Sequence, residues 1–78
     1  LSTEQQYNEY VLTSLRTIWG VDSAIIQNKF GAEIHAYFLK EIEKWISKEY
    51  ILTEENIITL TKEGKAFADA IASDLFIV

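Results

Sequence analysis

Residues 50–60 have the sequence YILTEENIITL, in which two apolar runs flank the polar segment Thr53-Glu54-Glu55-Asn56. Large and β-branched apolar residues favour strands, and a short polar segment between two such runs is typical of a β-hairpin. We therefore predict a hairpin with strands at Tyr50-Ile51-Leu52 and Ile57-Ile58-Thr59-Leu60. The segments on both sides of it have helical spacing instead.

The longest periodic segment, Ala32 to Glu49, directly precedes the hairpin. On a helical wheel its apolar residues and the single histidine share one arc, which contains Ile34, His35, Phe38, Leu39, Ile42, Trp45 and Ile46. The opposite side carries Glu33, Tyr37, Lys40, Glu43, Lys44 and Lys48. This pattern predicts an amphipathic helix whose apolar arc faces the core.

Two further helices are predicted upstream. The first is capped by Ser2 or Thr3, with Gln5 or Gln6 as the capping-box partner, and ends at Gly20. Its predicted apolar arc consists of Tyr7, Val11, Leu12, Leu15, Ile18 and Trp19. The second helix is short, and its apolar residues are Ile25, Ile26 and Phe30.

The second helix is capped by Asp22 or Ser23 and ends at Gly31. After the hairpin, Thr61 caps a last helix that is predicted to run to about Phe76. The residues predicted to face inward are Gly64, Phe67, Ala68, Ile71 and Leu75. Glycine inside a helix lowers its stability by about 1 kcal/mol relative to alanine, so Gly64 indicates close packing against the hairpin or the first helix.

Three helices, a hairpin and a C-terminal helix follow one another in the order of a winged-helix domain. The predicted fold class is therefore mainly α with a small β-hairpin, and residues 1–78 form a single winged-helix-like domain. In that fold the third helix would be the recognition helix, and the turn at Glu54 to Asn56 would be the wing. Because the chain begins at Leu1 and contains no Met, we expect it to be a fragment of a larger protein.

Composition excludes several kinds of site. Without cysteine the chain has no disulfide, no thiolate nucleophile and no cysteine-ligated zinc or iron–sulfur centre. No apolar run approaches about 18 residues and no signal peptide opens the chain, so we expect no membrane span and a cytoplasmic location.

A winged-helix DNA-binding module is the main alternative function. Lys40, Lys44 and Lys48 form a stripe on the exposed side of the third helix. However, the predicted wing carries Glu54 and Glu55 where contacts to phosphates would need basic residues, and the net charge is −5 from 12 acidic and 7 basic side chains. We therefore expect a solvated, salt-bridged helix face and no nucleic-acid partner.

Catalytic, cofactor-binding and metal-binding residues are not predicted in this chain. His35 is the only histidine, and no Ser, Asp or second ligand can be paired with it on sequence grounds. Arg16, Trp19, Gly20 and His35 are instead the candidates for an interdomain or cleft-facing surface. For Arg16 two interpretations remain: it complements the dipole of the first helix, or it contacts a neighbouring domain.

Three segments of the chain are informative when taken together: YVLTSLRTIWGVD at 10–22, KFG at 29–31, and LTKEG at 60–64 continuing into DAI at 69–71 and DLF at 74–76. They resemble the C-terminal domain of the oxygen-independent coproporphyrinogen III oxidase and haem chaperone family. The match spans about Tyr7 to Phe76 in the right order and spacing. Ser14 stands where the family often has Gly, and Lys62 where Pro is common at a first helical position.

The resemblance implies that the parent is a radical S-adenosylmethionine oxidoreductase similar to coproporphyrinogen dehydrogenase, or a haem chaperone of the same family. In such proteins an upstream barrel binds a [4Fe–4S] cluster through a Cys-x-x-x-Cys-x-x-Cys motif and cleaves S-adenosyl-L-methionine. This chain would then be the C-terminal domain that packs on the barrel, with a tetrapyrrole near the seam between the two domains. It would have no cofactor and no catalysis of its own.

Overall fold

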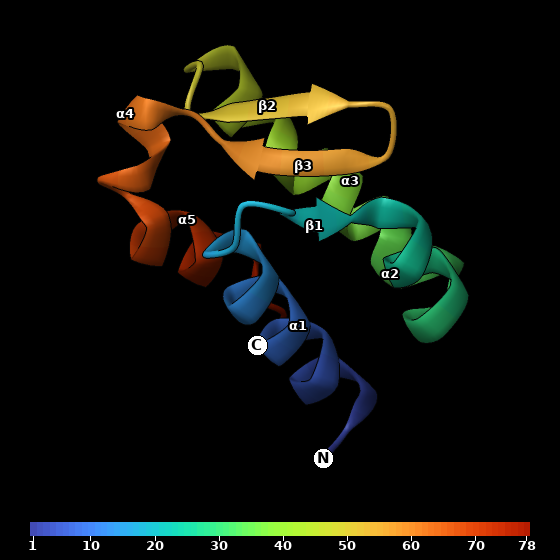
Figure 1. The fold of residues 1–78 in the computed structure, drawn as a ribbon. Coiled ribbons are helices and arrows are strands. Elements are labelled where there is room, and N and C mark those ends of the chain that lie inside the picture. The colour runs from blue at the N-terminus through green and yellow to red at the C-terminus, as the bar shows by residue number, and fades with distance from the viewer.

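The computed structural model describes all residues 1–78, as five helices and a three-stranded antiparallel sheet (Figure 1). The elements in chain order are α1 Thr3–Leu15, β1 Val21–Asp22, α2 Ser23–Phe30, α3 Ala32–Ser47, β2 Ile51–Glu54, β3 Ile57–Leu60, α4 Lys62–Lys65 and α5 Ala68–Leu75. Figure 1 shows the sheet on one side of the molecule, with α1 and α5 packed side by side next to it. The predicted fold class, mainly helical with a small winged-helix-like sheet, is confirmed.

Helix α1 begins as predicted and ends early. Ser2 and Gln5 form the capping box, because each side chain accepts a hydrogen bond from the other residue's backbone N–H. The helix stops at Leu15, well before the predicted end at Gly20, because the Thr17 hydroxyl competes for backbone groups. This hydroxyl donates to the Ser14 carbonyl at 2.8 Å and accepts from the Gly20 N–H at 3.2 Å.

The early end of α1 changes the position of two large apolar residues. Ile18 and Trp19 were expected in the apolar arc of the first helix, and this placement is wrong, although Trp19 was also named as a candidate for an interdomain surface. Their exposed fractions are 82% and 76%. Tyr7, Val11 and Leu15, which lie on the helical part of the same arc, are buried as predicted.

Strand β1 was not predicted. Val21 pairs with Ile58 and Asp22 with Ile57, so β3 lies in the middle of the sheet order β1-β3-β2. A strand of two residues is too short to show the alternation by which strands are recognised in a sequence. Gly20 enters this strand with φ 73°, and a Cβ atom there would lie 2.3 Å from the Ile58 carbonyl oxygen, so only glycine fits this approach.

The second and third helices lie close to their predicted bounds. Asp22 caps α2 by accepting from the Ala24 N–H at 2.9 Å, and Gly31 separates α2 from α3 with φ 100°. Helix α3 ends at Ser47 instead of Glu49, because Glu49 turns into the left-handed region with φ 64°.

The buried side of α3 is rotated relative to the predicted arc. Phe38 and Ile42 are buried, but Leu39 and Ile46 are exposed. Tyr37 was placed on the exposed side and is in fact half-buried, with its hydroxyl donating to the Phe76 carbonyl at 2.8 Å. The reason is that α5 and the residues after it cover this side of α3, a contact that a single helical wheel does not contain.

The hairpin is confirmed, with Ile51 opposite Leu60 and Glu54 opposite Ile57. The turn itself is shorter than the predicted Thr53–Asn56 segment, because Thr53 and Glu54 belong to β2. Glu55 takes a positive φ of 56° at the turn.

The predicted single helix from Thr61 to Phe76 is wrong, because the chain forms α4 and α5 with a turn at Ala66 and Phe67. Thr61 caps α4 as predicted and accepts from the Gly64 N–H at 3.0 Å. The Thr61 hydroxyl also donates to the Glu49 carbonyl at 2.8 Å, so α4 is held at the base of the hairpin while α5 packs on α1 and α3. Phe67, expected inside, is 47% exposed.

The core draws on every element except α4. Its thirteen buried apolar residues are Tyr7, Val11, Leu15, Val21, Ile26, Phe30, Phe38, Ile42, Ile51, Ile58, Ile71, Ala72 and Leu75. The end of α1 and β3 both contribute side chains to this core. The loop that follows α1 therefore lies next to β3, the middle strand of the sheet.

Candidate functional site

Residues 16–20, the loop between α1 and β1, contain three of the four residues that the sequence singled out, Arg16, Trp19 and Gly20. The fourth, His35, is half-buried in the first turn of α3 and does not line the hollow beside this loop. The structure therefore brings three candidates together in one loop and leaves His35 apart from the hollow. The part of all four in an interdomain contact stays a prediction.

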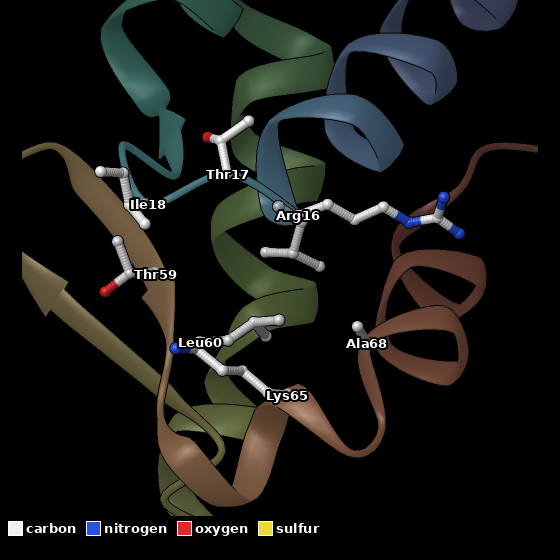
Figure 2. Close-up of a pocket in the computed structure, with 8 residues that line it drawn as sticks. Arg16, Thr17, Ile18, Thr59, Leu60, Lys65 and Ala68 are labelled. Atoms are coloured by element: carbon white, nitrogen blue, oxygen red, sulfur yellow. The ribbon is translucent and has the colours of Figure 1, made fainter.

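A hollow of about 520 Å³ lies beside the loop (Figure 2). It is bounded by the end of α1 and the loop, by β3, and by α4 and α5, and its lining residues are Leu15, Arg16, Thr17, Ile18, Thr59, Leu60, Lys65 and Ala68. Half of these side chains are apolar. The volume falls within the range of about 300–1,000 Å³ that is usual for ligand sites in proteins.

Arg16 lies at the C-terminal end of α1, where a cation complements the helix dipole. Its Nη2 atom is also 2.6 Å from Asp69 Oδ1 of α5, so the guanidinium already has an acidic partner within the chain. Figure 2 shows the guanidinium turned towards α5, while the aliphatic part of the side chain borders the hollow. Both side chains are exposed, at 57% and 82%, and such a pair contributes about 0–1 kcal/mol to stability.

The loop is tied to the rest of the chain near both ends although it exposes Ile18 and Trp19. The two hydrogen bonds of Thr17 tie it to the end of α1, and Gly20 approaches the backbone of β3 so closely that a Cβ atom would not fit. The two large apolar side chains therefore lie on a loop that is anchored on both sides. Sequence reasoning missed Ile18 as a surface residue, although Thr17 and Gly20 were signals that a helix could end before it.

Lys65 and Thr59 complete the hollow, and no motif in the sequence marks either residue. Lys65 comes from α4 and Thr59 from β3, which lies next to the loop only because β1 pairs with it. Their proximity to residues 16–20 is a property of the tertiary fold.

Two lysines of the predicted stripe, Lys44 and Lys48, have partners within the chain. Lys44 Nζ lies 2.7 Å from Asp74 Oδ2 and 3.8 Å from Glu41 Oε1, and the hydrogen bond to Asp74 raises the pKa of Lys44. Lys48 Nζ lies 5.0 Å from the centre of the Trp45 ring. Glu54 and Glu55 on the wing are exposed. This surface therefore offers a mixed charge pattern where a phosphate backbone would require a continuous basic one.

No three His, Cys, Asp or Glu side chains converge in a geometry that would hold a metal ion. None of the helices has the length and apolar character that crossing a membrane requires. The most buried ionisable group is Tyr7, whose hydroxyl donates to the Leu75 carbonyl at 2.8 Å and so has a structural partner.

Comparison with known proteins gives one family. The sequence model of the HemN C-terminal domain matches residues 1–67, which include the whole loop and every residue that lines the hollow except Ala68. No curated protein and no solved structure matches the chain.

Proposed function

The chain belongs to the HemN C-terminal domain family, and from this premise we propose that it is the accessory C-terminal domain of a radical S-adenosylmethionine protein resembling oxygen-independent coproporphyrinogen III oxidase. Its task in that protein is to dock on the barrel domain and to help cover a tetrapyrrole cleft. The [4Fe–4S] cluster and S-adenosyl-L-methionine belong to the barrel, because this chain has no cysteine to ligate a cluster. The chain itself catalyses no reaction.

One structural observation carries the docking role: the anchored loop that exposes Ile18 and Trp19 beside the hollow. Contiguous exposed apolar patches often mark a contact with a partner, and apart from the terminal residues, Ile18 and Trp19 are the most exposed of the large apolar side chains. Burying a side chain of the size of isoleucine contributes about 1.5–3 kcal/mol, and an aromatic residue of the size of tryptophan contributes more because it has more area. These two residues alone can therefore supply a substantial part of an interdomain contact.

The test uses the gene and the parent protein. The sequence encoded upstream of Leu1 should contain Cys-x-x-x-Cys-x-x-Cys. Amide hydrogen exchange, followed by mass spectrometry, should then be slower for residues 16–20 in the parent than in the 78-residue chain. The edge strand β2 of the same two proteins gives the internal reference.

Two results would contradict the proposal. One is an upstream sequence without the cysteine motif. The other is equal exchange of residues 16–20 in the parent and in the 78-residue chain, because a docked loop must be shielded from solvent.

A further inference from the structure

We propose that the hollow beside residues 16–20 is a binding site for an acidic, apolar segment of the partner domain. An apolar side chain of that segment fills the hollow, and a neighbouring carboxylate of the segment pairs with Lys65. This inference rests on the proposed function and deepens it, because it states the chemistry of the surface that the domain meets.

The apolar part of the site is continuous with the core. Leu15 lines the hollow and belongs to the buried core, Leu60 is half-buried at the end of β3, and Ala68 of α5 lines the hollow as well. Ile18 stands on the loop at the opposite edge and is almost fully exposed. An apolar side chain placed here would cover Ile18 and extend the packing that Leu15 begins, which is the usual form of the central contact of an interface.

The charge of the site is opposite to that of the molecule. The chain has 12 acidic and 7 basic side chains, yet the only ionisable residues that line the hollow are the cations Arg16 and Lys65. The Arg16 charge is already balanced by Asp69. Lys65 forms no salt bridge, since the ion pairs of the chain involve only Arg16 and Lys44 as cations.

Lys65 is positioned to receive a carboxylate at the edge of the hollow. Figure 2 shows its side chain extending from α4 towards β3. The hydroxyl of Thr59 borders the same space and can donate a hydrogen bond to an anion, whereas the Thr17 hydroxyl already donates to the Ser14 carbonyl. A single carboxylate fits this arrangement better than a phosphate backbone or an anionic membrane, because Asp69 and the net charge of −5 repel an extended polyanion.

The experiment compares two lysines of the same short helix in the parent protein. Lys65→Glu places a negative charge at the hollow, whereas Lys62→Glu makes the same change at an exposed residue of α4 that does not line it. We expect amide exchange of residues 16–20 to become about tenfold faster or more in Lys65→Glu, because reversing one partner of an interfacial charge pair weakens docking strongly. Lys62→Glu should exchange like the unmodified parent, and Lys65→Arg should keep the protection.

Thermal unfolding of the same variants in the 78-residue chain checks that each still folds. If the unmodified parent protects residues 16–20 and Lys65→Glu protects them equally well, the inference is overturned and the docking role stands. If residues 16–20 exchange as fast in the unmodified parent as in the 78-residue chain, both the inference and the docking role are contradicted. Protection of these residues in the 78-residue chain by duplex DNA or by vesicles of anionic phospholipid would also overturn the assignment to a protein segment.

Discussion

Gly64 is the residue at which α4 touches the base of the hairpin. A Cβ atom at this position would lie 1.9 Å from the Tyr50 carbonyl oxygen and 2.9 Å from the carbonyl carbon. Both are backbone atoms, and the Tyr50 carbonyl also accepts the Thr61 N–H at 3.0 Å, so neither can move without disturbing the start of α4. The glycine is therefore a packing requirement, as its position in the sequence predicted.

Replacing Gly64 by alanine should destabilise the domain. Alanine favours a helix by about 1 kcal/mol over glycine, but forcing an atom into a filled space costs about 1–3 kcal/mol and sometimes more. Because the clash is with backbone atoms that cannot move aside, we expect the upper end of this cost, and therefore a net loss of about 2 kcal/mol in the free energy of unfolding, measured by urea denaturation. The control Glu63→Ala, at an exposed neighbour, should change it by less than about 0.5 kcal/mol. A Gly64→Ala variant as stable as the original chain would show that the base of the hairpin moves far enough to accommodate the added methyl group.

Tyr7 is the buried ionisable residue with the clearest consequence for pH. Burial raises the pKa of its hydroxyl well above the usual value, and the nearby Tyr37 and Glu41 raise it further. In the unfolded chain a tyrosine loses its proton near pH 10. Above that pH the unfolded chain therefore releases a proton that folded Tyr7 keeps, and the free energy of unfolding falls.

We expect this loss of stability to begin at about pH 10 and to reach about 1.4 kcal/mol for each further pH unit from Tyr7 alone. Urea unfolding between pH 8 and about pH 11 measures it, with absorbance at 295 nm reporting phenolate formation. The variant Tyr7→Phe should start from a lower stability, because the Leu75 carbonyl loses its donor, and should show a shallower decline. An equally steep decline in Tyr7→Phe would assign the effect to other groups.

At the scale of the elements, predictions from sequence succeeded where local signals were sufficient. The Ser2 and Gln5 capping box, the Asp22 cap and the hairpin all appear as predicted, because side chains within a few residues determine them. The first error arose although the signal was local. The predicted first helix continued through Ile18 because its apolar periodicity continues there, whereas the Thr17 hydroxyl ends the helix through hydrogen bonds to residues only three positions away.

The break between α4 and α5 has a different origin, because contacts with distant parts of the chain determine it. Residues 61–76 have helical spacing throughout, yet the hairpin base holds Thr61 and Gly64 while α1 and α3 hold α5. The chain bends at Phe67, whose ring stacks on Tyr50 with centroids 5.1 Å apart. For the candidate site, the sequence identified the loop through Arg16, Trp19 and Gly20, but Lys65 and Thr59 join it only through tertiary packing.

Asp74 links α5 to α3, and this contact has a measurable dependence on pH. Partial burial would raise the pKa of Asp74, but hydrogen bonds from Lys44 Nζ and Trp45 Nε1 outweigh this effect and hold the pKa below its ordinary value. A carboxyl group with a lowered pKa stabilises the folded state above its unfolded pKa, near 3.9, and this contribution disappears as the pH falls further.

We therefore expect Asp74→Asn to lower the free energy of unfolding at neutral pH, by about 1 kcal/mol or less because the contact is partly exposed. The difference from the original chain should shrink as the pH falls below about 4, which urea denaturation at several pH values would measure. Asp69→Asn, in the exposed pair with Arg16, is the matched control and should have the smaller effect at neutral pH. A difference that stays constant down to about pH 2 would mean that charge is not its cause.

At the scale of the whole molecule, charge argues against the alternative of a DNA-binding module. We expect the chain to bind duplex DNA no more tightly than about 10⁻⁴ M at low salt, the weak end of non-specific binding. Fluorescence anisotropy measures this affinity. The double variant Glu54→Lys/Glu55→Lys, which gives the wing the charge that phosphates require, is the control and should bind more tightly. Binding of the original chain in the micromolar range would revive the alternative.

The family match ends at residue 67, but the folded unit does not. Helix α5 supplies Ile71, Ala72 and Leu75 to the core. Beyond it, the Asn8 side chain donates to the Ile77 carbonyl at 2.9 Å and accepts the Ile77 N–H at 2.8 Å. The last residues are thus bound to α1, close to the start of the chain.

A chain shortened to residues 1–67 should therefore fail to fold, because Tyr7, Val11 and the covered side of α3 would be exposed to water without α5. Removing only residues 76–78 is the matched control. It removes the partner of Asn8 and the acceptor of Tyr37 but keeps α5, and should leave a folded domain that is less stable by about 1–3 kcal/mol. Circular dichroism during heating distinguishes the two results, since only the control should show a cooperative transition. Cooperative unfolding of residues 1–67 would mean that α1, α2, α3 and the sheet suffice as a core, and that α5 covers this domain much as a separate partner would.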